Sequence, residues 1–357
     1  MKRTTLIHTL FLATLASSAL VARAQYAAYD LGTLGGTSAF PYGINIAGTV
    51  VGWSYTSGGD QHAFSYSGGH MTDLGTLGGL TSAAYGINSA GAIVGYSQIT
   101  GGATHAFSYS GGHMTDLGTP GGSSSLALGL NNAGTIVGQA FTSDNSVQHA
   151  FSRSGGVWRD LGTLGGSPSV AYSINSGGTI AGWSYKSGGA EHAFSYSGGV
   201  MRDLGTLGGS ASDGYAINDS GQIVGVSTTA AGNLHAFLWT TGGGMTDLGT
   251  LGGLYSWADA INSAGTIVGD SIASGGLHAY VDSGGVMTDL APYLASIGLT
   301  GDSGARSIND NGDIVGFAMT PDGYYHAFLL TVIPEPSTVA LLALGGAAWL
   351  LRRRRAF

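Results

Sequence analysis

The chain has 357 residues, of which 65 are glycine, 9% are charged and 43% are hydrophobic. This composition excludes a disordered polar tract, and seven prolines without a three-residue glycine period exclude collagen. No cysteine is present, so disulfides, thiolate metal sites and cysteine nucleophiles are excluded. Residues 25–333 hold five basic and nineteen acidic residues. So acidic a region repels phosphate backbones, and we expect it not to bind nucleic acid.

Residues 1–24 have the pattern of a secretory signal peptide. Lys2 and Arg3 form a basic start, an apolar stretch follows, and Ala22-Arg23-Ala24 fits the small-x-small cleavage rule. We therefore expect signal peptidase to cleave after Ala24. The alternative is a retained membrane anchor, but the apolar stretch is short for a span and contains polar residues.

Residues 25–333 consist of one motif that is repeated seven times. Three signatures keep one order and recur at intervals of about 44 residues. Asp-Leu-Gly-Thr-Leu-Gly-Gly, with two diverged copies, starts at Asp30, Asp73, Asp116, Asp160, Asp203, Asp247 and Asp289. Ile-Asn, or Leu-Asn in the third copy, ends at Asn45, Asn88, Asn131, Asn175, Asn218, Asn262 and Asn309. His-Ala-Phe, or His-Ala-Tyr in the sixth copy, starts at His62, His105, His149, His192, His235, His278 and His326.

Each repeat reads as four short strands. A first strand ends at Ile-Asn, a turn such as Asn88-Ser89-Ala90-Gly91 leads to the second strand, and the His-Ala-Phe triplet starts the third. The fourth strand ends at Asp-Leu-Gly, and the following glycine-rich segment crosses to the next repeat. Four strands in about 44 residues is the size of one blade of a β-propeller.

The two ends of the repeat array are complementary. Residues 29–32 resemble a fourth strand with no first three, and residues 325–329 resemble a third strand with no fourth. A closed ring uses this arrangement, because the N-terminal strand completes the last sheet and covers its edge. The sequence therefore predicts an all-β fold: a seven-bladed β-propeller that is closed by its N-terminal strand. An open β-solenoid is the alternative fold.

The triplet and its period resemble the HAF family of extracellular repeats, which is named for that triplet. The resemblance covers residues 26–331. It implies an exported repeat protein, and it implies no activity and no catalytic residues.

The repeated histidines suggest a ring of metal ligands, but one histidine per blade cannot converge on one ion. We expect each histidine to bond structurally with an aspartate of the Asp-Leu-Gly motif. Residues 309–313 resemble a short calcium loop but lack its late glutamate, so we expect a plain turn. No metal and no cofactor are predicted.

Acidic residues suggest an alternative enzymatic function. Glu191 is the only glutamate of residues 25–333, and we expect Asp213, Asp259 and Asp302 in the crossovers of the fifth to seventh repeats. At the mouth of a channel they would form an acidic site. The seventh repeat also carries an insertion, residues 291–300, and Arg306 on its first strand. A propeller lyase or glycosidase acting on polysaccharide is therefore the alternative hypothesis.

The loops between second and third strands are the most variable parts of the repeats. Their amides, carboxylates and aromatic rings suit sugar hydroxyls, although they suit solvent as well. The candidate ligand-binding residues are Asp60, Gln61, Asp144, Asn145, Gln148, Lys186, Glu191, Asn233, Asp322, Tyr324 and Tyr325.

The C-terminal end has three parts in a fixed order. Pro334-Glu335-Pro336 precedes an apolar stretch, residues 339–351, and then the four arginines Arg352, Arg353, Arg354 and Arg355. The stretch predicts a transmembrane helix of about 20 Å, short for a ~30 Å hydrocarbon core, with the arginines on the cytoplasmic side.

This tail, residues 334–357, closely resembles the PEP-CTERM sorting signal of Gram-negative bacteria. The resemblance implies processing by an exosortase-type membrane peptidase and a link to exopolysaccharide or biofilm. The same tail is also known under an ice-binding-protein C-terminal heading, but the repeats give no argument for ice binding. We expect a non-enzymatic scaffold or binding module that is exported, transiently anchored in the membrane, and then found at the cell surface or outside the cell.

Overall fold

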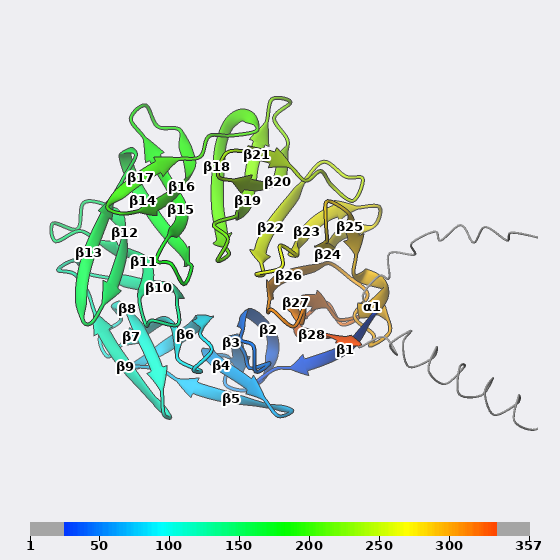
Figure 1. Cartoon of the computed structure of the whole chain (residues 1–357). Coiled ribbons are helices and arrows are strands. Elements are labelled where there is room, and N and C mark those ends of the chain that lie inside the picture. The colour runs from blue at the N-terminus through cyan, green and yellow to red at the C-terminus, as the bar shows by residue number, and fades with distance from the viewer. Residues whose placement is uncertain (1–24, 334–357) are drawn as a thin grey trace, which may run out of the picture. The chain divides into compact units, whose positions relative to one another are not determined.

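The computed structural model describes residues 25–333. They form seven four-stranded antiparallel sheets, which are arranged as blades around a central axis (Figure 1). The seven-bladed β-propeller is therefore confirmed. The predicted signal peptide and the predicted C-terminal helix lie outside the described residues. Within residues 25–333, no helix is long and apolar enough to cross a membrane.

The first four blades take their strands in chain order from the inside to the outside. Blade 1 contains β2 (Gly35–Ile44), β3 (Val50–Thr56), β4 (Gln61–Ser67) and β5 (His70–Gly75). Blade 2 contains β6 (Gly78–Ile87), β7 (Ile93–Ile99), β8 (Thr104–Ser110) and β9 (His113–Gly118). Blade 3 contains β10 (Ser125–Leu130), β11 (Ile136–Phe141), β12 (Gln148–Ser154) and β13 (Val157–Gly162). Blade 4 contains β14 (Gly165–Ile174), β15 (Ile180–Lys186), β16 (Glu191–Ser197) and β17 (Val200–Asp203).

Two further blades repeat this order, and the last one is composite. Blade 5 contains β18 (Gly208–Ile217), β19 (Ile223–Thr229), β20 (Leu234–Thr240) and β21 (Gly244–Asp247). Blade 6 contains β22 (Ser256–Ile261), β23 (Ile267–Ala273), β24 (Gly276–Asp282) and β25 (Met287–Asp289). Blade 7 contains β26 (Ser303–Ile308), β27 (Ile314–Met319), β28 (Tyr325–Ile333) and β1 (Gln25–Gly32).

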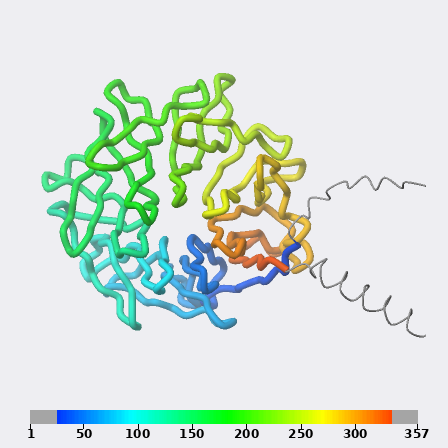
Figure 2. The backbone as a smooth tube through the Cα atoms, in the orientation of Figure 1, coloured from blue at the N-terminus to red at the C-terminus, as the bar shows by residue number. Residues whose placement is uncertain are grey.

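The N-terminal strand closes the ring as predicted. β1 lies beside β28 in the last sheet, and Figure 2 shows the blue start of the described chain against the orange and red last blade. His326 Nδ1 lies 2.9 Å from an oxygen of Asp30, so the histidine–aspartate pair of blade 7 joins the two ends. Without β1, the edge of β28 would be open to solvent.

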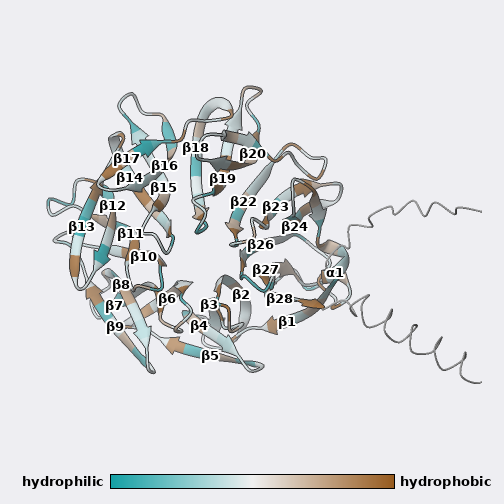
Figure 3. Ribbon diagram, viewed as in Figure 1, coloured by the Kyte–Doolittle hydropathy of each residue, from teal (hydrophilic) through white to brown (hydrophobic). Residues whose placement is uncertain are grey.

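The hydrophobic core lies between the blades. One cluster combines Ala181 and Ala193 of blade 4 with Ile217, Ile223 and Phe237 of blade 5, and equivalent clusters recur around the ring. Figure 3 accordingly shows brown apolar segments within the strands of every blade. Because each cluster needs both of its blades, a single repeat has no core of its own.

The glycine at the third position of every second strand has a steric cause. A Cβ at Gly182 of β15 would collide with the carbonyl oxygen of Val170 and with the ring of Phe194. The first strand bulges at this level, since the register shifts between Ala171 and Ser173. Glycine therefore allows the first two strands to pack closely.

The insertion of the last repeat folds as the short helix α1 (Ala291–Ala295), which the sequence did not predict. Leu290, Leu294 and Leu299 bury their side chains in a cluster of blades 6 and 7. The helix therefore covers the side of this interface with apolar residues spaced for a helical turn.

Candidate functional site: the central channel

The innermost strands surround a cavity of about 540 Å³ on the axis of the propeller. Each blade contributes one side chain at the same level of this cavity. In every blade, this residue lies three positions before the asparagine of the Ile-Asn or Leu-Asn motif. These seven residues are Tyr42, Tyr85, Leu128, Tyr172, Tyr215, Asp259 and Arg306. The cavity has the volume of a small-molecule site.

The four tyrosines form two pairs. The ring centroids of Tyr42 and Tyr85 lie 4.8 Å apart, and those of Tyr172 and Tyr215 lie 5.5 Å apart. Burial, followed by the neighbouring tyrosines, raises the pKa of Tyr85. Burial, followed by Asp213 and Asp259, raises the pKa of Tyr215. These two hydroxyl groups consequently stay protonated at any physiological pH, and that of Tyr215 donates to Asp213 Oδ2 at 3.4 Å.

Charged residues complete the wall of the channel at blades 6 and 7. Arg306 donates from one terminal nitrogen to Asp259 at 2.8 Å and to Asp270 at 3.2 Å, and its guanidinium lies 4.9 Å from the ring centre of Phe317. Burial alone would lower the pKa of Arg306, but Asp259 and Asp270 raise it. Oδ2 of Asp259 is buried and has no partner among the described residues. The channel therefore offers both an acceptor and a cation at one side.

One end of the channel is surrounded by the seven asparagines of the Ile-Asn motifs. Each side-chain amide donates to the backbone carbonyl of the equivalent asparagine in the next blade, at 3.1 to 3.4 Å. The last bond runs from Asn309 to Asn45 and completes the circle. The sequence predicts turns at these asparagines, but the ring that they form was not predicted.

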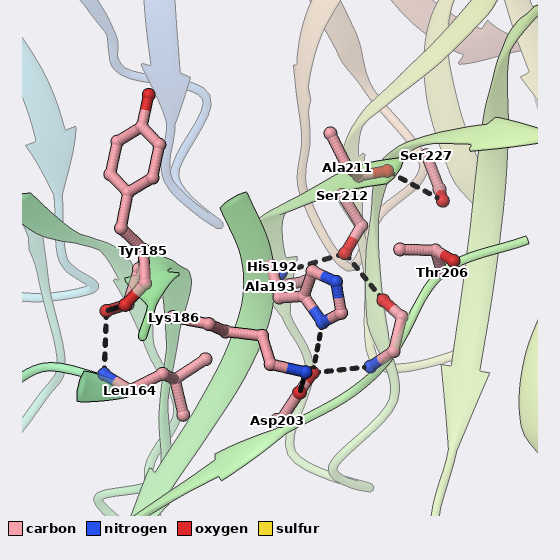
Figure 4. Close-up of polar contacts among 12 residues, drawn as sticks. Leu164, Tyr185, Lys186, His192, Ala193, Asp203, Thr206, Ala211, Ser212 and Ser227 are labelled. Carbon is pink, nitrogen blue, oxygen red and sulfur yellow. Dashed lines mark hydrogen bonds and ion pairs between the residues drawn. The ribbon is translucent and has the colours of Figure 1, made fainter. Parts of the chain in front are cut away.

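The histidines pair with the aspartates of the Asp-Leu-Gly motifs, as predicted. In every blade the Nδ1 atom of the histidine lies 2.7 to 2.9 Å from a carboxylate oxygen of the Asp-Leu-Gly motif. Figure 4 shows His192 beside Asp203, which also pairs with Lys186 at 2.7 Å. Ser212 of the next blade accepts from Ala193 N–H and donates to the Gly205 carbonyl (Figure 4). This network joins blades 4 and 5.

The only glutamate of the propeller lies against an aspartate of the next blade. Glu191 on β16 is within hydrogen-bonding reach of Asp213 on β18, and Asp213 Oδ1 is buried without another partner among the described residues. Burial, followed by Glu191, raises the pKa of Asp213. Tyr215 lies 3.4 Å from Asp213 Oδ2, so this carboxyl pair is directly behind the channel wall.

The expected crossover positions of two acidic residues are wrong. Asp213 lies within β18 and Asp259 within β22, because the first strands extend further than the repeat pattern indicates. Asp302 does precede its strand, but its carboxylate accepts from Leu277 N–H on β24 at 2.9 Å and so links blade 7 to blade 6. The three acids do not form one common site, since Arg306 pairs with Asp259 and Glu191 lies against Asp213.

Several residues of the predicted loop site support the fold locally. Asp144 accepts from Thr142 and Ser146, and these hydrogen bonds lower its pKa to about 2. Asn145 has a φ of 56° and accepts from Ser123 N–H at 2.6 Å. Gln61 donates to the Tyr96 hydroxyl at 3.1 Å.

The remaining loop candidates are distributed over different blades. Asp60 and Asp322 are exposed, whereas Gln148 and Asn233 are half-buried. Tyr325 packs against Phe40, and the half-exposed Tyr324 lines a groove of about 530 Å³ that also includes Tyr55. Lys186 pairs with Asp203. Among the predicted loop residues, only Glu191 lies beside the channel wall.

The position of the tyrosines in the channel was not predicted, because Ala-Tyr-Gly-Ile-Asn reads only as a strand pattern. A signal was present, however. The residue three positions before each asparagine changes from tyrosine to leucine, aspartate and arginine, while the asparagine stays constant. Such variation at one position of an otherwise regular strand indicates that core packing does not determine which residue stands there.

Comparisons with known proteins identify the tail and the fold. Residues 332–355 match the PEP-CTERM protein-sorting motif. None of the curated proteins compared with the chain matches it in sequence. Among solved structures, a puromycin-hydrolyzing peptidase from Mycobacterium tuberculosis is similar at 14% identity with a TM-score of 0.53, over 85% of this chain and 55% of that one.

Two further structures have lower TM-scores. TolB from Acinetobacter baumannii is 12% identical over 79% of this chain and 63% of its own, with a TM-score of 0.46. The six-bladed Aleuria aurantia lectin is 16% identical over 62% of this chain and 77% of its own, with a TM-score of 0.36. The chain thus spans less than two thirds of the length of the peptidase and of TolB. Its sorting motif is that of an exported protein directed to the cell surface, and its described residues form a seven-bladed β-propeller.

Proposed function

We propose that this chain is a non-enzymatic surface or matrix protein whose central channel binds a sugar unit of an extracellular polysaccharide. The observation that carries the proposal is the set of four tyrosines at one level of a 540 Å³ cavity. The sorting motif supports an exported location, where such polysaccharides occur. Membership of the HAF repeat family is part of this proposal and rests on the repeated triplet.

The chemistry of the channel suits a sugar. Tyrosine rings offer flat apolar surfaces for the C–H face of a pyranose, and their protonated hydroxyls donate hydrogen bonds. Asp259 and Arg306 add an acceptor and a charged donor on the opposite part of the wall. A few placed polar groups in a concave cavity are the usual arrangement of a small-ligand site.

Screening residues 25–333 on a glycan array, followed by calorimetry, tests this site. This fragment is suitable because its ring and core are complete without the two ends. We expect Tyr85→Ala and Tyr172→Ala each to weaken binding about tenfold, by loss of stacking worth roughly 1.4 kcal/mol. Tyr29→Ala is the matched control, because Tyr29 is 49% exposed and lies on β1. Binding that survives both channel substitutions would place the ligand elsewhere.

We also propose that an exosortase-type membrane peptidase processes the tail, after signal peptidase has cleaved behind Ala24. Replacing Pro334, Glu335 and Pro336 by alanine should trap the full-length chain at the inner membrane. Fractionation and immunoblotting measure this. Unchanged release to the surface or medium would contradict the proposed partner.

The carboxyl pair behind the channel favours one second candidate, a propeller enzyme that cleaves polysaccharide. Two carboxyl groups, one protonated and one ionised, are the groups that glycoside hydrolysis requires. Glu191 and Asp213 offer two carboxyl groups, and the raised pKa of Asp213 suits a general acid. The pair would have to separate from hydrogen-bonding distance to about 5 Å to flank a glycosidic bond. Product analysis by mass spectrometry, with Glu191→Gln as the inactive variant, separates this candidate from a pure binding module.

A further inference from the structure

We infer a second site, independent of the channel: a groove between blades 4 and 5, formed around Arg202 and Trp239, that binds a carboxylated sugar of an acidic polysaccharide. The groove has a volume of about 380 Å³. Its walls come from β16 and β17 of blade 4, from β19 and β20 of blade 5, and from the turns before β15 and β19. It shares no residue with the central channel.

Most basic residues of the propeller lie in one part of the ring. Of the five basic residues of 25–333, four belong to blades 3 and 4, namely Arg153, Arg159, Lys186 and Arg202. The acidic residues, in contrast, are distributed over all seven blades. Blades 3 and 4 are therefore the part of the propeller where basic residues balance the acidic ones best, so an anion is repelled least there.

Arg202 differs from the other basic residues in having no partner. Lys186 and Arg306 form ion pairs, and the guanidinium groups of Arg153 and Arg159 lie over aromatic rings. Within the propeller as described, Arg202 is exposed and makes neither an ion pair nor a ring contact. Its five donors are available to a ligand.

The other groove residues complement this charge. Trp239 is half-buried and offers its indole to the same groove, while Ser195, Ser197 and Thr241 supply hydroxyls. A guanidinium binds a carboxylate in a fork, an indole covers the C–H face of a sugar ring, and hydroxyls bond with its alcohol groups. A hexuronate unit presents all three features together.

The neighbouring interface supplies an internal control. Arg159 and Tyr196 occupy the equivalent positions between blades 3 and 4, but there the guanidinium lies 5.7 Å from the centre of the tyrosine ring. The arginine of that interface is thus already engaged by an aromatic ring of its own chain. Between blades 4 and 5, the equivalent pair lines an open groove.

Calorimetric titration of residues 25–333 with an oligogalacturonate tests this site. We expect binding that weakens several-fold between 50 and 300 mM salt, because an exposed ion pair is screened. Arg202→Gln should weaken binding at least tenfold, Arg202→Lys should retain part of it, and Trp239→Ala should also weaken it. Arg159→Gln is the matched control and should leave the affinity within about twofold.

Three outcomes would overturn the inference. One is equal affinity for a neutral galacto-oligosaccharide of the same length. Another is unchanged oligogalacturonate affinity in Arg202→Gln. The third is equal affinity for polyglutamate, which would show an anion site without sugar recognition. Tyr85→Ala should not affect oligogalacturonate binding here, so failure of this site and failure of the channel proposal are distinguishable.

Discussion

The channel residues on the innermost strands and the asparagines that directly follow these strands lie three positions apart, but they differ in how strictly the repeat preserves them. The asparagines of the inner ring are identical in all seven blades, and each one bonds to the next blade. The channel residues comprise four tyrosines, a leucine, an aspartate and an arginine. A position is constant where every blade must hold its neighbour, and it varies where the side chain faces the cavity. Changes in the residues that join the blades, and in those beside the channel, test this division between structural and ligand-facing positions.

The largest effect is expected from removing the strand that closes the ring. Deletion of Gln25–Gly32 removes β1, exposes the edge of β28 and breaks the His326–Asp30 pair. We expect the melting temperature to fall by more than about 10 °C, since several kcal/mol of packing and ladder bonds are lost. Calorimetry measures this, with Tyr29→Ser as a control. A nearly silent deletion would show that the ring does not depend on β1.

A smaller loss is expected from breaking the asparagine ring at one point. Asn175→Ala removes a buried donor to the Asn218 carbonyl and an acceptor of Thr179 N–H. Because backbone groups are then left without partners, we expect a cost of about 2–3 kcal/mol in urea unfolding. The neighbouring exposed Ser176→Ala should change stability by less than about 0.5 kcal/mol. Equal effects of the two changes would refute the ring as a structural element.

The histidine–aspartate pairs should each contribute less, because they are partly exposed. His192→Ala is expected to cost about 1 kcal/mol, the value of a typical intramolecular hydrogen bond. Zinc and nickel should leave the melting temperature unchanged, since a ligand that binds only the folded state must stabilise it. Stoichiometric metal in the purified protein, lost with His192→Ala, would contradict the structural role.

Acid titration probes the same pair. Burial by itself would raise the pKa of Asp203, but hydrogen bonds from Lys186, Gly205 N–H and His192 lower it overall. A carboxyl with a lowered pKa stabilises the fold above its unfolded pKa, about 3.9, and loses this contribution as the pH falls through the folded value. Lys186→Met should therefore flatten the loss of stability below about pH 4.

The smallest effect on stability is expected from Asp213, in the carboxyl pair behind the channel. Here stability falls as the pH rises, whereas at Asp203 it falls as the pH decreases. The raised pKa of Asp213 means that the folded state holds a proton that the unfolded state releases above about pH 3.9. Stability therefore falls as the pH rises from there through the folded pKa. Asp213→Asn should raise the melting temperature by about 2 °C at pH 7.5 and leave it unchanged at pH 3.5. A rise of equal size at both pH values would show that Asp213 is not protonated.

Periodicity was sufficient to predict the number of blades, the closing strand and the role of the histidines. These features follow from motifs that recur seven times, such as those of His192 and Asn175, so the period of the repeat is enough to reveal them. The channel tyrosines and the Glu191–Asp213 pair were not predicted. Glu191 and Asp213 belong to different blades, and their proximity depends on the angle between neighbouring sheets. The period of the repeat does not specify that angle.

The position of β28 has a mechanical consequence. β28 is an inner strand of its sheet, between β27 and β1, although it is the last strand of the propeller. A pulling force applied at Ile333 therefore loads two ladders of hydrogen bonds at once, whereas an edge strand would peel away from one. Single-molecule stretching from Ile333 should show a higher rupture force in the intact propeller than after deletion of β1. The N-terminal strand, besides closing the ring, would then act as a clamp against tension on the C-terminal side.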